Sequence, residues 1–535
     1  MDIRFPVSTC LFALLSLLSP FEAHAGLDQE GARWWGHVAL LAADRMEGRE
    51  TGTPGYDRAT DYVVRQFERL GLRSAGPDGF RQPAVFVSRK VDMRSSSITL
   101  RGRSGDHDLR LGADGFFQMA CAQAESLEAG AVFVGYGLVL PDLHYDDLAG
   151  LDLRGRIAVY LLGGPSDVPE PLRSHAQSIA ERWARFRDAG AIGWLSIPNP
   201  KTLDLPWERI ALNNSGPALI LADSVLDERR GQRFAATLNP ARTLELFEGS
   251  GFNLPGLLAL ADSGRVLPRF PLSVRIGSRA RYATLRVVSD NLVAVFPGTD
   301  PVLRDQFVVL SAHLDHLGIV PQAGGDSVMN GALDNAAGVA TLLETARALR
   351  RSRLKPKRSI VFLALTGEEK GLQGSRHFAA RLASLPGPVV ADLNIDMLLP
   401  IAPFDRITVF GLGESDLGDL ARVVAERHKM TVQADPMPLR NRFIRSDQFS
   451  FVRIGVPALA FTSGGLPGSA IESLRTLWMH ERYHAPGDDL KQPVDWVSAA
   501  RFNRYFLELA LEIANRERRP EWKMESYFRR FARRD

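Results

Sequence analysis

Carboxylate and imidazole side chains follow several apolar runs of this 535-residue chain, at the points where the runs end. They are His313 and Asp315 after residues 307–310, Glu368 and Glu369 after 360–365, and Asp396 after 389–395. Carboxylates gathered at one partly buried rim repel one another and resist desolvation, so protons or cations must compensate them. Carboxylates mixed with neutral imidazoles are a ligand set for a divalent ion such as zinc, and the absence of thiolates argues against a purely structural zinc site.

The spacing of these residues suggests how they divide the chemistry. His313 is a candidate ligand, and Asp315, two residues later, can orient its ring. Glu368 and Glu369 are adjacent, so their side chains diverge, and one can bind metal while the other acts as a general base on a water. Two further candidates, Asp334 and His484, have simpler interpretations when taken alone. An Asp before a helix is more commonly an N-cap, and a histidine in a loop is more commonly an ordinary loop residue.

The segments that carry these residues alternate between strand and helix patterns from residue 291 onward. Strands are expected at 291–296, 307–310, 359–365, 389–395 and 458–462, and helices at 335–349, 372–382, 417–427 and 494–514. Continuous apolar strands that alternate with helices predict an α/β fold with a mostly parallel sheet, covered by helices on both faces. Ligands of such sheets bind beyond the carboxyl ends of the strands, so we expect the candidate residues to share one rim.

The rest of the chain divides into further units. Residues 26–117, with helical patterns at 31–43 and 57–70, are expected to form the N-terminal part of the same domain, whose main part is 281–515. From about residue 118, short apolar runs are punctuated by glycine and proline. This change of pattern predicts a smaller, β-rich domain inserted at 118–280.

The two ends of the chain have distinct compositions. Residues 1–25 resemble a secretory signal, with Arg4 before an apolar run and Ala23-His24-Ala25 before a cleavage point at Gly26. We therefore expect an exported protein, periplasmic or secreted; a buried N-terminal helix is the alternative. The basic segment 516–535 is predicted to be a solvated helical tail, with contact to a membrane surface as the alternative.

Composition also limits the partners. A net charge of only +3, without a basic stripe interleaved with aromatic residues, argues against a nucleic-acid partner. No segment after the signal is long and apolar enough for a transmembrane helix. Removal of the signal leaves Cys121 as the one cysteine, so no disulfide within the chain is expected.

Five short motifs contain the candidate residues. In chain order they are AHLDH at 312–316, LDNAAG at 333–338, TGEE at 366–369, NIDM at 394–397 and YHAP at 483–486. Together they resemble the M28 family of zinc peptidases, of the aminopeptidase and glutamate carboxypeptidase type. EGR at 47–49 with GTPG at 52–55 is similar to the N-terminal loop of that family. VGYG at 134–137, YDD at 145–147 and GRI at 155–157 are similar to the start of its protease-associated (PA) domain, so the resemblance covers essentially the whole mature chain.

The resemblance implies a zinc-exopeptidase-like fold and two zinc ions per chain. Asp334 would bridge the ions, His313 and Asp396 would complete one site, and Glu369 and His484 the other. Glu368 would be the general base, and Asp315 would orient His313. Many members carry histidine where this chain has Gln448, which puts substrate contacts there in doubt. His316, His377, His428 and His480 receive no role and are expected to be structural or exposed.

The implied activity is release of N-terminal amino acids from peptides with a free N-terminus. The alternatives are a carboxypeptidase, a dipeptidase or another amide hydrolase on the same fold. A catalytically silent, receptor-like binding protein is a further alternative, although every ligand position is kept in this chain.

Overall fold

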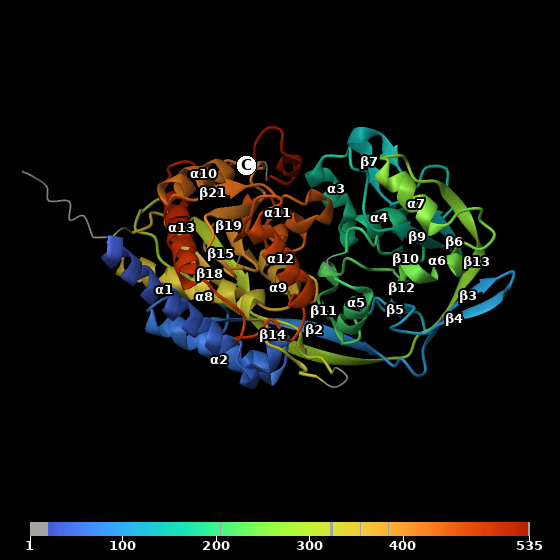
Figure 1. The fold of residues 1–535 in the computed structure, drawn as a ribbon, viewed down its shortest axis with the longest axis horizontal. Coiled ribbons are helices and arrows are strands. Elements are labelled where there is room, and N and C mark those ends of the chain that lie inside the picture. Colours follow the sequence, from blue (N-terminus) through green and yellow to red (C-terminus); the bar gives the residue numbers. More distant parts are fainter. Residues whose placement is uncertain (1–19, 204, 322–324, 354, 383–384, 533–535) are drawn as a thin grey trace, which may run out of the picture.

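The computed structural model describes residues 20–203, 205–321, 325–353, 355–382 and 385–532. Most of the predicted signal peptide, residues 1–19, lies outside the described residues. Two units lie side by side, each built around a sheet of its own (Figure 1). Within the described ranges, no helix has both the length and the apolar character needed to cross a membrane.

The larger unit is built on a ten-stranded sheet with the order β11-β2-β14-β18-β15-β19-β22-β20-β21, and β1 pairs with β14. Its strands are β1 (Arg73–Ser74), β2 (Arg81–Val91), β11 (Ala218–Leu221), β14 (Tyr282–Phe296), β15 (Phe307–His313), β18 (Ser359–Leu365), β19 (Val389–Ile395), β20 (Arg406–Phe410), β21 (Thr431–Gln433) and β22 (Ala458–Ser463). The central strands β18, β15, β19 and β22 are parallel. Antiparallel β14 and β20 flank them, so the sheet is mixed, and the predicted parallel arrangement applies to its centre.

Helices cover both faces of this sheet because its central strands are apolar on both sides. Along β15, Val308 and Leu310 pack into one core, while Phe307 and Val309 pack into another on the opposite face. The first core is closed by α1 (Pro20–Leu41), α2 (Pro54–Arg69), α8 (Ala337–Arg351), α10 (Leu417–Arg427) and α13 (Trp496–Asn515). The second is closed by α9 (Gln373–Ala379) and α11 (Gln448–Val452).

The smaller unit has an eight-stranded sheet with the order β4-β3-β13-β6-β9-β10-β12-β5. Its strands are β3 (Ser97–Gly102), β4 (Gly105–Leu109), β5 (Gly115–Phe117), β6 (Ser126–Val134), β9 (Ile157–Leu161), β10 (Gly193–Ile197), β12 (Phe234–Leu238) and β13 (Arg269–Arg279). Its helices are α3 (Glu170–Gln177), α4 (Ile179–Asp188), α5 (Trp207–Asn213), α6 (Thr243–Leu246) and α7 (Leu254–Asp262). Parallel pairs β6–β9, β9–β10 and β10–β12 form the middle of the sheet.

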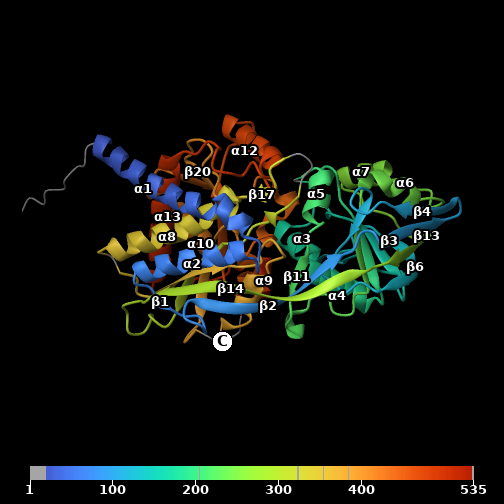
Figure 2. The same cartoon turned by 90° about the horizontal axis from the view of Figure 1, so that it is seen from below.

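The boundary between the units differs from the predicted residue 118. The second sheet already includes β3 and β4, because β3 pairs with β13. Conversely, β11 lies within the predicted insertion but pairs with β2 of the larger sheet. Figure 2 shows the long strands β2 and β14 side by side, leading from the larger unit toward the smaller one. The two units are therefore joined by shared β structure as well as by loops.

The C-terminal segment is not the solvated helical tail that its basic composition predicted. Up to residue 532 it packs on the fold, with Trp522 and Phe528 buried in the core beneath α11 and β22. The Trp522 indole donates a hydrogen bond to the main-chain oxygen of Gly455 at 3.0 Å. Arg530 forms an ion pair with Asp142 of the smaller unit at 2.6 Å. The two aromatic side chains fix the segment on the fold by their burial, while the arginines at 518, 519, 529 and 530 stay exposed to solvent.

Candidate metal centre

Three parallel strand ends bring their side chains to one rim, as their order in the sheet requires. His313 is the last residue of β15, Asp396 follows β19, and Glu368 and Glu369 form a turn shortly after β18. The register aligns Leu310 of β15 with neighbours on both β18 and β19, so these strands end at the same level. The Nε2 atom of His313 lies 3.3 Å from Asp396 Oδ1.

Asp334 enters the same rim from the segment just before α8. It is not the N-cap of that helix, since Ala336 holds the cap position. Its carboxylate instead lies between two histidines: Oδ1 is 3.3 Å from His313 Nε2, and Oδ2 is 3.3 Å from His484 Nε2. The remote loop after α12 (Ala470–Glu481) thus delivers His484 to the centre. His484 Nε2 also lies 3.2 Å from Glu369 Oε2.

The electrostatics of this group require positive charge. Burial alone would lower the pKa of His484, but Glu369 and Asp334 outweigh it and raise that pKa to about 10. The pKa of His313 is likewise raised well above its usual range, because Glu368, Asp334 and Asp396 oppose the effect of burial. Without a metal, the carboxylates therefore hold protons on both imidazoles. A divalent cation can replace those protons, because metal binding to histidine releases them.

The donor set fits zinc. One ligand atom each from His313, Asp334 and Glu369 lies within 4.8 Å of the others, which is compact enough for a shared ion. All the donors are imidazole nitrogens or carboxylate oxygens, the ligand types found in catalytic zinc sites. Asp396 adds a fourth donor through its contact with His313, and His484 adds a fifth through its contact with Asp334.

Asp315 supports the centre differently from the prediction. The ring of His313 contacts its main-chain oxygen, at 3.0 Å from Nδ1, whereas the carboxylate Oδ1 is 4.0 Å away. The carboxylate instead accepts hydrogen bonds from the main-chain N–H groups of Glu368 and Glu369, at 3.2 and 3.3 Å. Thr51 adds a third, from its hydroxyl at 3.0 Å. Asp315 therefore orients His313 through its backbone and holds the turn of the two glutamates through its side chain.

Glu368 is set apart from the metal-facing carboxylates by its environment. It lines the pocket beside the centre together with Glu369. Burial raises its pKa well above the usual range, although the charge on His313 works in the opposite direction. The pKa of Glu369 is instead lowered well below its usual range, since His484 and His316 outweigh the effect of burial. The two adjacent glutamates thus differ in their electrostatic environment, since the pKa of the Glu368 carboxyl is raised and that of the Glu369 carboxyl is lowered.

His316 is a member of this centre that sequence reasoning missed. Its side chain is fully buried, and Nδ1 lies 2.9 Å from Glu369 Oε1. Its ring also meets that of His484 edge to face, with the centroids 5.8 Å apart. The sequence feature that could have indicated this role is its position in the first motif, three residues after His313. By contrast, His428 contacts Glu508 at 2.7 Å, and His480 is exposed.

Two buried charged residues hold the backbone around Asp334. Asp488 accepts hydrogen bonds from the main-chain N–H groups of Leu333 and Asp334, both at 2.9 Å. The Arg49 guanidinium donates to four main-chain oxygens, those of Leu41, Leu314, Asn330 and Gly331, at 2.6 to 2.9 Å. Burial lowers the pKa of Arg49 to about 10, which still leaves it cationic at neutral pH. The N-terminal loop, the end of β15 and the Asp334 segment are thereby tied together.

Comparison with known proteins is consistent with this geometry. The model of peptidase family M28 matches residues 291–510, which include the histidines and carboxylates of the candidate centre described above. A probable zinc metalloprotease of Pyrenophora tritici-repentis is 37% identical over 109 residues, covering 20% of this chain and 24% of that protein. Leupeptin-inactivating enzyme 1 of Streptomyces exfoliatus is 35% identical over 111 residues, covering 20% and 22%. This chain thus matches only about a quarter of the length of these curated relatives.

Residues 291–510 form a peptidase family M28 domain. The whole fold, including the smaller unit, is similar to an aminopeptidase from Aneurinibacillus sp. strain AM-1. That likeness has a TM-score of 0.54 at 17% identity and covers 92% of this chain and 96% of the other.

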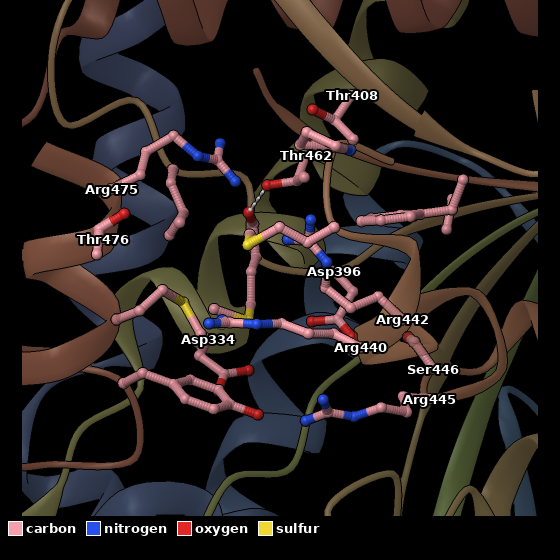
Figure 3. A pocket seen from close by; sticks show the side chains of 18 of the residues that line it. Asp334, Asp396, Thr408, Arg440, Arg442, Arg445, Ser446, Thr462, Arg475 and Thr476 are labelled. Atoms are coloured by element: carbon pink, nitrogen blue, oxygen red, sulfur yellow. Dashed lines mark hydrogen bonds between the residues drawn. The ribbon is translucent and has the colours of Figure 1, made fainter. Parts of the chain in front are cut away.

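A pocket of about 300 Å³ opens beside the metal-facing residues of the M28 domain. Figure 3 shows Asp334 and Asp396 on its wall, with several arginines from other segments around it. Gln448, where a histidine was expected from the resemblance, also lines it. Its side-chain amide, however, is hydrogen-bonded within the protein. Its Oε1 accepts from Asn394 Nδ2 at 2.9 Å, and its Nε2 donates to the main-chain oxygen of Phe443 at 2.6 Å.

The smaller unit contacts the M28 domain on two sides of the centre. From α5, Arg209 donates to the main-chain oxygens of His480 and Tyr483, at 2.8 and 3.1 Å, and Asn213 Nδ2 lies 3.4 Å from His484 Nδ1. From α3, the Ser174 hydroxyl donates to Asn441 Oδ1 at 2.9 Å. Between these contacts lies a second cavity, of about 580 Å³, whose wall is contributed by both units and includes Glu369 and His484.

Proposed function

We propose that this protein is a zinc-dependent exopeptidase that releases N-terminal amino acids from peptides with a free N-terminus. The observation that carries the proposal is the convergence of two histidines and three carboxylates beside a pocket with Glu368 on its wall. The M28 domain and the overall likeness to a bacterial aminopeptidase support the same activity.

The arrangement around Asp334 supports two ions that share one carboxylate. Its Oδ1 faces His313, which also contacts Asp396, and its Oδ2 faces His484, which also contacts Glu369. Each oxygen therefore has its own histidine and its own second carboxylate, as a bridging ligand would. Bound zinc would supply a Lewis acid for the scissile carbonyl and would make a water more acidic.

The remaining chemistry belongs to Glu368. As the water oxygen bonds to the peptide carbonyl carbon, Glu368 takes a proton from that water. It then gives the proton to the amine nitrogen as the carbon–nitrogen bond breaks. A carboxyl that holds a proton between two steps benefits from a raised pKa, and burial raises the pKa of Glu368. Asp315 keeps the base in place through the main-chain N–H of Glu368.

An amino-acid p-nitroanilide panel, with and without a chelator, tests the activity. We expect hydrolysis that a chelator abolishes and added zinc restores. Peptides with an acetylated N-terminus should be cut far more slowly than their free counterparts. Faster cleavage of the acetylated peptides would favour a carboxypeptidase or another amide hydrolase. Zinc binding without cleavage of any substrate would favour the receptor-like alternative.

We also propose that the protein is exported, on the strength of the signal-like pattern in residues 1–25. N-terminal sequencing of the protein recovered from cell fractions tests this proposal. A mature chain that begins at Gly26 in the periplasm or the medium is expected. An uncleaved protein confined to the cytoplasm would contradict export. The likeness of the smaller unit to a PA domain remains a prediction of the sequence motifs.

A further inference from the structure

Arg475 reaches the pocket of the M28 domain from helix α12. Its Nη1 donates a hydrogen bond to the Ser463 hydroxyl at 2.6 Å, and that hydroxyl donates to the main-chain oxygen of Leu399 at 2.7 Å. Figure 3 shows the guanidinium extending toward Thr462, which is itself fixed by a hydrogen bond to the main-chain oxygen of Met397. The end of β22 therefore holds this cation in a defined position.

The Arg475 guanidinium has no carboxylate partner of its own. Within the described ranges, no carboxylate oxygen lies within 4.0 Å of its nitrogens. The two acids whose charge acts on Arg475 have other partners: Asp435 pairs with Arg442, and Glu472 Oε2 accepts from the main-chain N–H of Gly468. Desolvation lowers the pKa of Arg475 to about 10, and Arg442 adds to that effect while both acids oppose it. A half-buried cation without a paired anion is costly, and a bound anion would offset that cost.

The lining of the pocket suits an anion carried on an apolar stem. Apolar side chains, including Met397, Leu399, Phe410 and Met479, line the pocket together with Arg475 and the metal-facing carboxylates. Apart from Glu368 and those carboxylates, Glu472 is the one acid among the lining residues that the structure describes. Three more arginines line the pocket, and one of them, Arg442, lies over the ring of Phe410 with its guanidinium carbon 5.1 Å from the centroid.

We propose that Arg475 anchors a substrate carboxylate in this pocket, so that the enzyme prefers peptides that present a negative charge next to the scissile bond. The proposal rests on the proposed exopeptidase function, because the pocket is shared with the metal centre. The carboxylate has two possible sources. It is either the side chain of an N-terminal glutamate or aspartate, or the terminal carboxylate of a short peptide. A guanidinium recognises both through the same charge-assisted hydrogen bonds.

Two substrate pairs separate these sources. Glutamyl and glutaminyl p-nitroanilide differ only in the side-chain charge, and Leu-Leu and Leu-Leu-amide differ only in the terminal charge. We expect kcat/KM to be at least tenfold higher for the charged member of one pair. In Arg475→Gln that ratio should fall about tenfold or more, and in Arg475→Lys by less, because lysine keeps the charge without the fork geometry. Arg422→Gln, an exposed arginine on α10 paired with Asp419, is the matched control and should keep the wild-type ratio.

The outcomes decide the proposal in either direction. Charged-to-neutral ratios below about threefold for both pairs, or a ratio that survives Arg475→Gln, would overturn it. If the zinc-loaded wild-type protein hydrolyses none of these substrates, that result would instead refute the proposed function. In that case, calorimetric binding of L-glutamate and L-glutamine to the zinc-loaded protein still tests the subsite. Binding that Arg475→Gln abolishes supports it, with glutamate favoured if the side-chain carboxylate is the anchor and both ligands bound equally if the terminal carboxylate is. Binding that survives Arg475→Gln, or no binding of either ligand, refutes it. Circular dichroism of each variant shows whether it is folded.

Discussion

Asp488 offers a direct test of how the backbone positions Asp334, a proposed metal ligand. Its carboxylate accepts from the main-chain N–H of Asp334 at 2.9 Å, from that of Leu333 at 2.9 Å and from Gln492 Nε2 at 2.6 Å. In Asp488→Asn one acceptor oxygen becomes an NH₂ group, which must then face a donor. One charge-assisted hydrogen bond is lost, at a cost of about 2 kcal/mol. If the loss of this hydrogen bond displaces Asp334, and the whole cost appears in the free energy of zinc binding, zinc should bind about 30-fold more weakly.

Zinc affinity of the purified protein, measured by competition with a chelating dye, is the appropriate assay. The neighbouring Asp489→Asn serves as a control. Its carboxylate accepts from the main-chain N–H of Lys491 at 2.9 Å and lies 3.9 Å from Arg482, so it is not bonded to the Asp334 segment. The control should bind zinc within about twofold of the wild type. Wild-type zinc affinity in Asp488→Asn, with loss of zinc in Asp334→Ala, would refute the claim that Asp488 holds the ligand in place.

Three further predictions concern the base, the smaller unit and pH. Glu368→Gln should retain zinc but lose about 10²- to 10⁴-fold in kcat, since only proton transfer is removed; wild-type kcat would rule out this base. Asn213→Leu should weaken zinc binding about tenfold. If the side-chain amide of Asn213 is rotated by 180°, its otherwise unpartnered Oδ1 can accept a hydrogen bond from His484 Nδ1–H, which leaves His484 Nε2 free to bind metal. Asn214→Leu is the control, and equal zinc affinity in the two variants would exclude this role. Burial raises the pKa of Asp147 from 3.8 to about 6, so the folded state loses stability as the pH rises through this interval, by about 3 kcal/mol at most once Asp147 is fully ionised. The stability of Asp147→Asn relative to wild type should therefore rise between pH 4 and pH 7 in urea unfolding, and a pH-independent difference would contradict the burial argument.

The strand-end logic predicted part of the centre without any homology. His313, Glu369 and Asp396 follow apolar runs, and the carboxyl ends of parallel strands lie at one edge of a sheet. Asp334 and His484 could not be found this way. One precedes a helix and the other lies in a distant loop, and each has a commoner structural role. Only the ordered set of five motifs linked them to the other three, and the structure brings all five together.

The misses have physical causes as well. The role of His316 depends on its 2.9 Å contact with Glu369, which is 53 positions away in the chain. The prediction for the C-terminal tail weighed its arginines and overlooked the burial of Trp522 and Phe528. The pattern of short strands did indicate a second unit. It did not predict that β11 would pair with β2, because the pairing of a strand depends on partners far away in sequence.

The contacts of α5 and α3 with the M28 domain link the position of the smaller unit to the candidate metal centre. Arg209 and Asn213 contact the loop that carries His484, and Ser174 contacts the segment around Asn441 on another side. A swing of the smaller unit away from the M28 domain would break those contacts. Any separation of the two units would thus also loosen the loop that carries His484. The position of the smaller unit is therefore coupled to the position of the loop that carries His484.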